Sequence, residues 1–136
     1  MTQPDTLNAL LAEEHAAIHL YGVIGPRLPD ALREYARAAY DDHRRHRDLL
    51  VELVKAAGGT PATPLLTYAL PDLSNARAAA EGIEDSLALR WHEAVRTAPD
   101  RARVAGALAD EAAHLATLRY ALRRNAADAV RAFPGR

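Results

Sequence analysis

The sequence predicts an all-α protein, an antiparallel four-helix bundle in which two helical hairpins are joined by one long connection. The first observation behind this prediction is composition. The 136 residues are rich in Ala, Leu, Arg and Glu, which favour helices, and poor in aromatic and β-branched residues, which favour strands. The second is that apolar residues recur at helical spacing in four segments, with only one long connection between them. The length fits a single domain, residues 1–136.

The first predicted hairpin contains helices at about residues 5–25 and 29–57. The pair Gly25-Pro26 ends the first helix because both residues disrupt helical geometry. Pro29 suits the first turn of the second helix, where its missing N–H has no partner to lose, and Gly58-Gly59 marks the end of that helix. The connection is short, so we expect the two helices to lie antiparallel.

The second predicted hairpin contains helices at about residues 74–98 and 99–131. Ser74 is the expected N-cap of the third helix, because its hydroxyl can accept a hydrogen bond from a free backbone N–H. Pro99-Asp100 begins the fourth helix, which continues to about Arg131. This connection is also short, so these helices are again expected to be antiparallel.

Residues 58–74, GGTPATPLLTYALPDLS, form the long connection between the hairpins. The segment contains three prolines and has no helical period. At up to about 3.3 Å per residue it can run the length of a helix of ~25 residues, itself ~37 Å long. Such a crossover is a known bundle topology. We expect four apolar side chains to pack it onto the bundle: Leu65, Leu66, Tyr68 and Leu70.

The two predicted hairpins resemble each other when the chain is shifted by 70 residues. Glu14 then falls on Glu84, Tyr21 on Trp91, and Pro29-Asp30 on Pro99-Asp100. The shared pattern is an acid, six residues, an aromatic, seven residues, and Pro-Asp. This weak repeat suits a bundle of two similar hairpins.

Each predicted helix carries polar residues near its middle, on the face that the apolar spacing assigns to the core. A buried carboxylate costs several kcal/mol unless it is paired or coordinated. Antiparallel packing would bring the four mid-points to one level. A metal site or a set of buried hydrogen-bonded pairs would both satisfy these groups. The candidates are Glu14 in the first helix, Asp42, His43 and His46 in the second, Glu84 in the third, and Glu111 and His114 in the fourth.

Two choices within this set stay open. Asp42 and His43 compete for one inward position, and Glu81 lies one turn before Glu84. The residue types suit a di-metal site, because carboxylates bridge cations and a histidine three residues after a carboxylate shares its helix face. Such a site takes one Glu from each of two helices and Glu-x-x-His from each of the other two.

The chain resembles the ferritin-like superfamily. The residues that carry the resemblance are Glu14-x6-Tyr21 in the first helix and Glu111-Ala-Ala-His114 in the fourth, together with the two short hairpins and the long crossover. EEHAAIHLYGVIGPRL and the later TYALP resemble a small uncharacterised bacterial family within it. The resemblance implies two iron or manganese ions and reaction with dioxygen or peroxide. The second helix departs from the pattern, because the residue three before His46 is His43 rather than Glu.

The composition of the chain excludes several kinds of site and partner. The chain has no Cys, which excludes disulfides, thiolate nucleophiles and cysteine zinc sites. A net charge of -1 predicts neither a nucleic-acid nor a membrane partner. There is no signal-peptide pattern and no apolar run near the ~20 residues that span a bilayer, so we expect a cytoplasmic protein. The superfamily resemblance favours a homodimer. No substrate and no catalytic residue can be named.

Two other functions remain open from the sequence. One is a metal-free ferritin-like bundle that acts as a binding or dimerisation module, in which Arg44, Arg45 and Arg47 neutralise the acids in place of metal. The other is a small-ligand pocket between the bundle and the crossover, lined by Leu65, Leu66, Tyr68 and Trp91.

Overall fold

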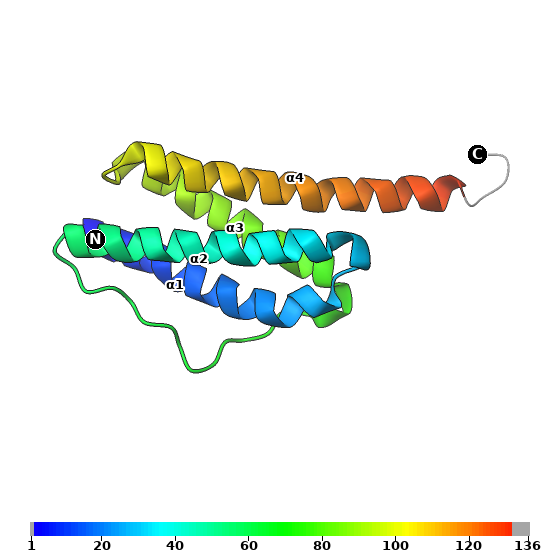
Figure 1. Ribbon diagram of the computed structural model, residues 1–136, viewed down its shortest axis with the longest axis horizontal. Helices are drawn as coiled ribbons and strands as arrows, with labels where there is room; N and C mark the ends of the chain where they lie inside the picture. The colour runs from blue at the N-terminus through cyan, green and yellow to red at the C-terminus, as the bar shows by residue number, and fades with distance from the viewer. Residues whose placement is uncertain (1, 132–136) are drawn as a thin grey trace.

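The computed structural model describes residues 2–131, and the side chains of residues 2–123, as a bundle of four long helices (Figure 1). No strand occurs among the described residues. Short 3-10 turns flank the helices at Gly25–Arg27, Asp30–Leu32 and Leu73–Asn75. The helices are α1 Gln3–Ile24, α2 Arg33–Ala56, α3 Ala76–Thr97 and α4 Arg101–Arg131.

The two predicted hairpins are confirmed. Helix α1 packs along α2, and α3 packs along α4, each pair joined by a short connection, while α1 also packs against α3. Contacts between α2 and α4 are sparse. Figure 1 shows the crossover running back along the outside of the first hairpin, from the end of α2 to the start of α3. The protein is therefore an all-α, antiparallel four-helix bundle with one long crossover.

Local sequence signals explain most helix boundaries, with two corrections. The Thr2 hydroxyl and the Asp5 carboxylate cap the start of α1 reciprocally. The prediction that α2 begins at Pro29 is wrong by four residues, because Pro29 is extended and the next three residues form a separate 3-10 turn. Asn75 rather than Ser74 caps α3, since its side chain accepts a hydrogen bond from the Ala78 N–H.

The apolar core is divided into two parts by a polar layer. One apolar cluster fills the end of the bundle that contains Leu7, Leu50 and Trp91, and the other fills the end that contains Ile24 and Leu118. Buried Glu and His side chains from the middle of all four helices lie between the clusters. Leu122, one turn after the fully buried Leu118 of α4, is 48% exposed.

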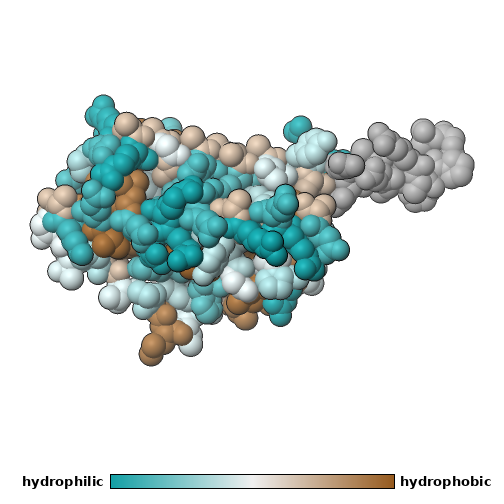
Figure 2. Space-filling model, in the orientation of Figure 1, coloured by the Kyte–Doolittle hydropathy of each residue, from teal (hydrophilic) through white to brown (hydrophobic). Residues whose placement is uncertain are grey.

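The crossover is held to the bundle by hydrogen bonds rather than by its leucines. Leu65, Leu66 and Leu70 are 67%, 101% and 54% exposed, so their predicted packing is wrong. Figure 2 shows an apolar group projecting at the lower edge of the molecule, where the crossover runs in Figure 1. Tyr68 is half-buried and its ring lies 5.0 Å from that of His19. Asn8 of α1 anchors the segment by accepting from the Ala62 N–H and donating to the Thr60 carbonyl, both at 2.8 Å.

None of the described helices combines the length and the apolar character required to cross a membrane.

Candidate metal centre

Six of the seven candidate side chains meet in the polar layer between the apolar clusters. All six are buried, and Glu14, His43, Glu84 and Glu111 are inaccessible to solvent. Asp42 is the exception, because its side chain lies at the edge of the layer and is 19% exposed. The six come from every helix of the bundle: Glu14 from α1, His43 and His46 from α2, Glu84 from α3, and Glu111 and His114 from α4.

His43, and not Asp42, takes the central position that the sequence left open. Its ring lies between carboxylates from two other helices. The Nδ1 atom is 2.7 Å from Glu14 Oε2, and the Nε2 atom is 2.8 Å from Glu84 Oε1. A side chain from α2 therefore connects the acids of α1 and α3 through the centre of the bundle.

The 70-residue repeat is also visible in the structure. The aromatic side chain of each hairpin donates a hydrogen bond to the central acid of the other hairpin. The Tyr21 hydroxyl donates to Glu84 Oε1 at 2.5 Å, and Trp91 Nε1 donates to Glu14 Oε1 at 2.8 Å. Tyr35 extends the first contact, because its hydroxyl lies 2.6 Å from that of Tyr21. Both aromatics therefore fix the orientation of a central Glu.

Contacts with carboxylates on both ring nitrogens hold the two outer histidines, His46 and His114. His46 Nδ1 faces Glu14 Oε1 at 3.3 Å, and its Nε2 contacts Asp110 Oδ2 at 2.9 Å. His114 Nδ1 faces Glu84 Oε2 at 3.2 Å, and its Nε2 contacts Asp42 Oδ2 at 2.8 Å. A carboxylate that accepts from the far N–H of an imidazole turns the near nitrogen inward as a lone-pair donor, an arrangement typical of metal-bound histidines.

Asp110 was missed in the sequence, although a signal for it exists. Asp42-x-x-x-His46 in α2 matches Asp110-x-x-x-His114 in α4, with His43 at the position that Glu111 takes in α4. The Asp of each segment bonds the final His of the other. The outer carboxylates are therefore part of the same two-fold pattern as the central residues.

Glu111 is the one central carboxylate that accepts no hydrogen bond. Both of its carboxylate oxygens are buried and neither has a hydrogen-bond partner. The nearest basic atoms are His46 Nδ1, 3.2 Å from Oε1, and His43 Nδ1, 3.5 Å from Oε1. Burial raises the pKa of Glu111 to about 7, against the lowering effect of His114 and His46.

The pKa values of the other two central acids are lowered, whereas the pKa values of the three histidines are raised. Burial opposes the charged form of Glu14 and Glu84, but hydrogen bonds with the histidines outweigh it and hold the pKa of both carboxyl groups below their ordinary range. Burial also opposes the charged imidazoles. Hydrogen bonds to the carboxylates outweigh it here too, so the pKa of His43 lies well above its ordinary value, and the pKa values of His46 and His114 rise to about 10.

The competing residues lie outside the centre. Glu81 pairs with Arg77 and Arg119 at the surface of α3 and α4. Arg45 pairs with Asp42 and lies 3.9 Å from Asp110, so it reaches the outer carboxylates but none of the central acids. His15 bonds the Ala62 carbonyl at 2.9 Å.

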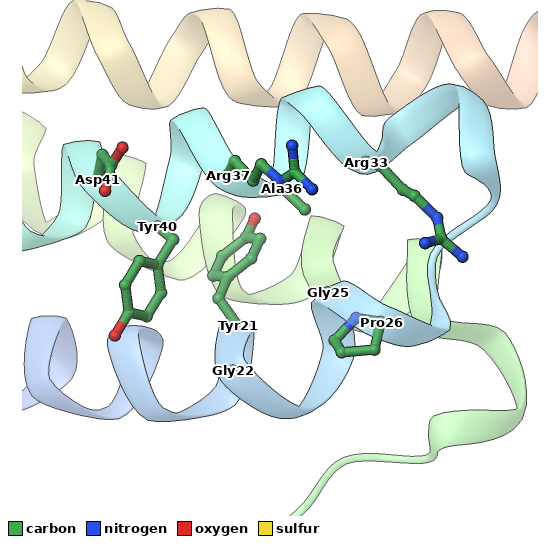
Figure 3. Close-up of a pocket in the computed structure, with 9 residues that line it drawn as sticks. All are labelled: Tyr21, Gly22, Gly25, Pro26, Arg33, Ala36, Arg37, Tyr40 and Asp41. Atoms are coloured by element: carbon green, nitrogen blue, oxygen red, sulfur yellow. The ribbon is translucent and has the colours of Figure 1, made fainter.

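Two surface grooves border the centre. One lies on the outer face of α1 and α2, has a volume of about 460 Å³, and is lined by Tyr21, Arg33 and Arg37 among others. Figure 3 shows the Tyr21 ring between the two helices, with its hydroxyl directed toward α2. The other, about 510 Å³, lies between α2 and α4, and its lining includes His46 and Asp110. The predicted pocket between the bundle and the crossover is present in part, as a groove of about 390 Å³ whose lining includes Leu65, Tyr68 and His19. Two of its predicted lining residues do not contribute, because Trp91 is fully buried and Leu66 is fully exposed.

The central side chains fit metal ions. They form two groups of four, and within each group the candidate donor atoms lie within 4.8 Å of one another. Both groups contain His43 and Glu111. The unsatisfied oxygens of Glu111 and the inward nitrogens of His46 and His114 are chemically suited to a cation. The groups are Glu14, His43, His46 and Glu111, and His43, Glu84, Glu111 and His114.

Two antiparallel hairpins joined by one long crossover give this bundle a ferritin-like fold. The chain belongs to the family described as a domain of unknown function, DUF4439, whose model matches residues 6–136. It is similar in structure to a conserved hypothetical protein, rv2844, from Mycobacterium tuberculosis, with 27% identity, 86% of this chain and 94% of that chain covered, and a TM-score of 0.79.

A second solved structure shares the fold. It is described as a ferritin like, diiron-carboxylate protein from Bacillus anthracis str. Ames. Its identity to this chain is 24%, with 90% of this chain and 99% of that chain covered, and the TM-score is 0.74. No protein with a curated description matches the chain.

Proposed function

We propose that this protein binds a divalent transition-metal ion in the polar layer at the middle of the bundle. The observation that carries the proposal is Glu111, a buried carboxylate whose two oxygens have no hydrogen-bond partner although they face imidazole nitrogens. A buried carboxylate that accepts no hydrogen bond is costly, and a bound cation lowers that cost. Carboxylate and imidazole donors suit first-row ions such as iron and manganese.

The chain's own residues prepare such a site in three ways. Asp42 and Asp110 hold His114 and His46 with their Nδ1 atoms inward. Tyr21 and Trp91 fix Glu84 and Glu14. The apolar clusters above and below exclude water. The groove between α2 and α4, which includes His46, offers the ion a route from solvent.

The proposal extends to oxidation chemistry by analogy with the Bacillus anthracis structure, which is described as a diiron-carboxylate protein. Iron held by carboxylates and imidazoles would supply electrons to dioxygen or peroxide. We propose that this protein, when loaded with ferrous iron, oxidises that iron or a small substrate.

The first experiment measures metal content by elemental mass spectrometry after anaerobic reconstitution with iron or manganese. We expect bound metal in the wild type, at least a tenfold lower content in Glu111→Gln, and wild-type content in Glu93→Gln, which removes the same charge from an exposed position of α3. The iron-loaded protein is then tested for oxygen consumption. A wild type that takes up no metal would refute the proposal.

The alternative function is a metal-free bundle that binds another protein or a second copy of itself. The observation that favours it is that both ring nitrogens of His43 lie at hydrogen-bond distance from carboxylates, Nδ1 from Glu14 and Nε2 from Glu84, as a charged imidazolium would require. This alternative predicts that chelators leave the melting temperature of the purified protein unchanged. Metal binding predicts a fall, because a ligand that binds only the folded state stabilises it.

A further inference from the structure

His43 is the one position at which α2 and α4 differ within their shared pattern. The corresponding residue of α4 is Glu111. His43 belongs to both groups of candidate donors. Its contacts put Nδ1 in the group with Glu14 and Nε2 in the group with Glu84, at 2.7 Å and 2.8 Å from the two carboxylates. The number of ions that the centre can hold therefore depends on what both ring nitrogens can do at once.

A carboxylate and an imidazole differ in this respect. An ionised carboxylate has two acceptor oxygens and no proton, so it can bridge two cations. A neutral imidazole has a free lone pair on only one nitrogen, and the other nitrogen carries a proton. The protonated nitrogen cannot be a ligand, and its N–H points at the place that a second ion would occupy.

We propose that His43 restricts this centre to one divalent metal ion, held by His43 Nδ1, Glu14, His46 and Glu111, while the Nε2–H of His43 takes the place of a second ion beside Glu84. This inference rests on the proposed function, since it assumes that the centre binds metal. It departs from the two ions that the superfamily resemblance implies.

The contacts of the two groups favour the side of Glu14. The unsatisfied Glu111 Oε1 lies 3.2 Å from His46 Nδ1 and 3.5 Å from His43 Nδ1. Donor atoms bound to one small cation at about 2.1 Å lie about 3–3.5 Å apart, which agrees with these separations. On the other side, Glu111 Oε2 is farther from His114 Nδ1, at 3.9 Å.

Glu84 is also better satisfied without metal than Glu111 is. Its Oε1 accepts from the Tyr21 hydroxyl at 2.5 Å and lies 2.8 Å from His43 Nε2. Its Oε2 lies 3.2 Å from His114 Nδ1. Glu14 is held in a similar way by Trp91 Nε1 and His43 Nδ1, so the distances to Glu111, which belongs to both groups, distinguish the two sides.

The test counts ions in His43→Glu, which restores Glu-x-x-His in α2. Anaerobically reconstituted protein is separated from free ferrous iron, and iron per chain is measured by elemental mass spectrometry. We expect one ion in the wild type and two in His43→Glu. The matched control is His92→Glu, which makes the same change at an exposed position of α3 and should keep one ion. Circular dichroism reports whether each variant is folded.

A second pair of variants keeps the inference testable if His43→Glu does not fold. Glu14→Gln should lose the ion, whereas Glu84→Gln should retain one. Two ions in the wild type, loss of iron in a folded Glu84→Gln, or a single ion in a folded His43→Glu would overturn the inference and leave metal binding intact. No ion in the wild type would instead refute the proposed function itself.

Discussion

At the scale of single residues, the centre contrasts two kinds of buried carboxylate. Glu14 and Glu84 each accept a hydrogen bond from an aromatic side chain of the other hairpin. Glu111 has no hydrogen-bond partner. All three are buried, so burial alone does not determine their energetics. The presence or absence of hydrogen-bond donors determines them. Because Glu111 has none, it is the carboxylate that a bound metal ion would stabilise most.

This contrast predicts that Glu111→Gln stabilises the metal-free protein above neutral pH. The pKa of Glu111 is raised to about 7 from 4.5, so its cost grows as pH rises from 4.5 to 7 and stays constant above that range. The amide has no charge to bury. Urea denaturation should show little difference at pH 5 and a gain of roughly 1–3 kcal/mol in the free energy of unfolding at pH 8.

The comparison variant is Glu14→Gln. It weakens the contacts of a carboxylate that already has donors in the metal-free state, so it should lower the free energy of unfolding at pH 8. If both variants shifted stability in the same direction, the distinction between satisfied and unsatisfied carboxylates would be wrong.

At the scale of elements, sequence reasoning succeeded where local signals act and failed where tertiary contacts decide. The four helices, both hairpins and the crossover follow from spacing, caps and breakers. The choice between Asp42 and His43 does not, because adjacent residues differ by about 100° around a helix and both fall within a broad apolar face. Asp110 was overlooked because a half-exposed Asp beside Glu111 resembles an ordinary surface residue.

The crossover is a second case in which tertiary contacts, rather than local sequence signals, determine the structure. Its leucines were expected to anchor it, yet polar contacts to α1 hold it, with both groups of the Asn8 amide engaged. We predict that Asn8→Ala lowers the free energy of unfolding by about 1–2 kcal/mol, since it leaves backbone groups of the crossover unpaired. It should also speed proteolysis within residues 58–74 without changing metal content.

The matched variant for the crossover is Leu66→Ser. Leu66 is fully exposed, so its replacement should leave both stability and proteolysis within error of the wild type. A larger effect for Leu66→Ser than for Asn8→Ala would mean that apolar packing holds the segment after all.

At the scale of the whole molecule, the bundle is two similar hairpins that complete each other. Aromatic donors and outer carboxylates all cross from one hairpin to the other: Tyr21 to Glu84, Trp91 to Glu14, Asp42 to His114 and Asp110 to His46. The polar layer therefore forms only when the hairpins dock. Its protonation should couple directly to global stability, which gives the last prediction.

The stability of the metal-free protein should fall as pH rises from 7 to 9. The pKa values of His46 and His114 are raised from 6.5 to about 10, so the folded state keeps protons that the unfolded state has released. Their contribution is fully present below pH 6.5 and is lost as pH rises through about 10. Each histidine can lower the free energy of unfolding by up to about 1.4 kcal/mol per pH unit.

Urea denaturation of the metal-free and metal-loaded protein at pH 7, 8 and 9 measures this slope. Metal binding removes the Nδ1 proton of His46, so the loaded protein should lose less stability over the same range. His46→Gln should flatten the slope of the metal-free protein, because the titrating group is gone. A metal-free protein whose stability is constant or rises from pH 7 to 9 would show that neither histidine is charged in the folded bundle, and that Glu14 and Glu84 are not held by imidazolium donors.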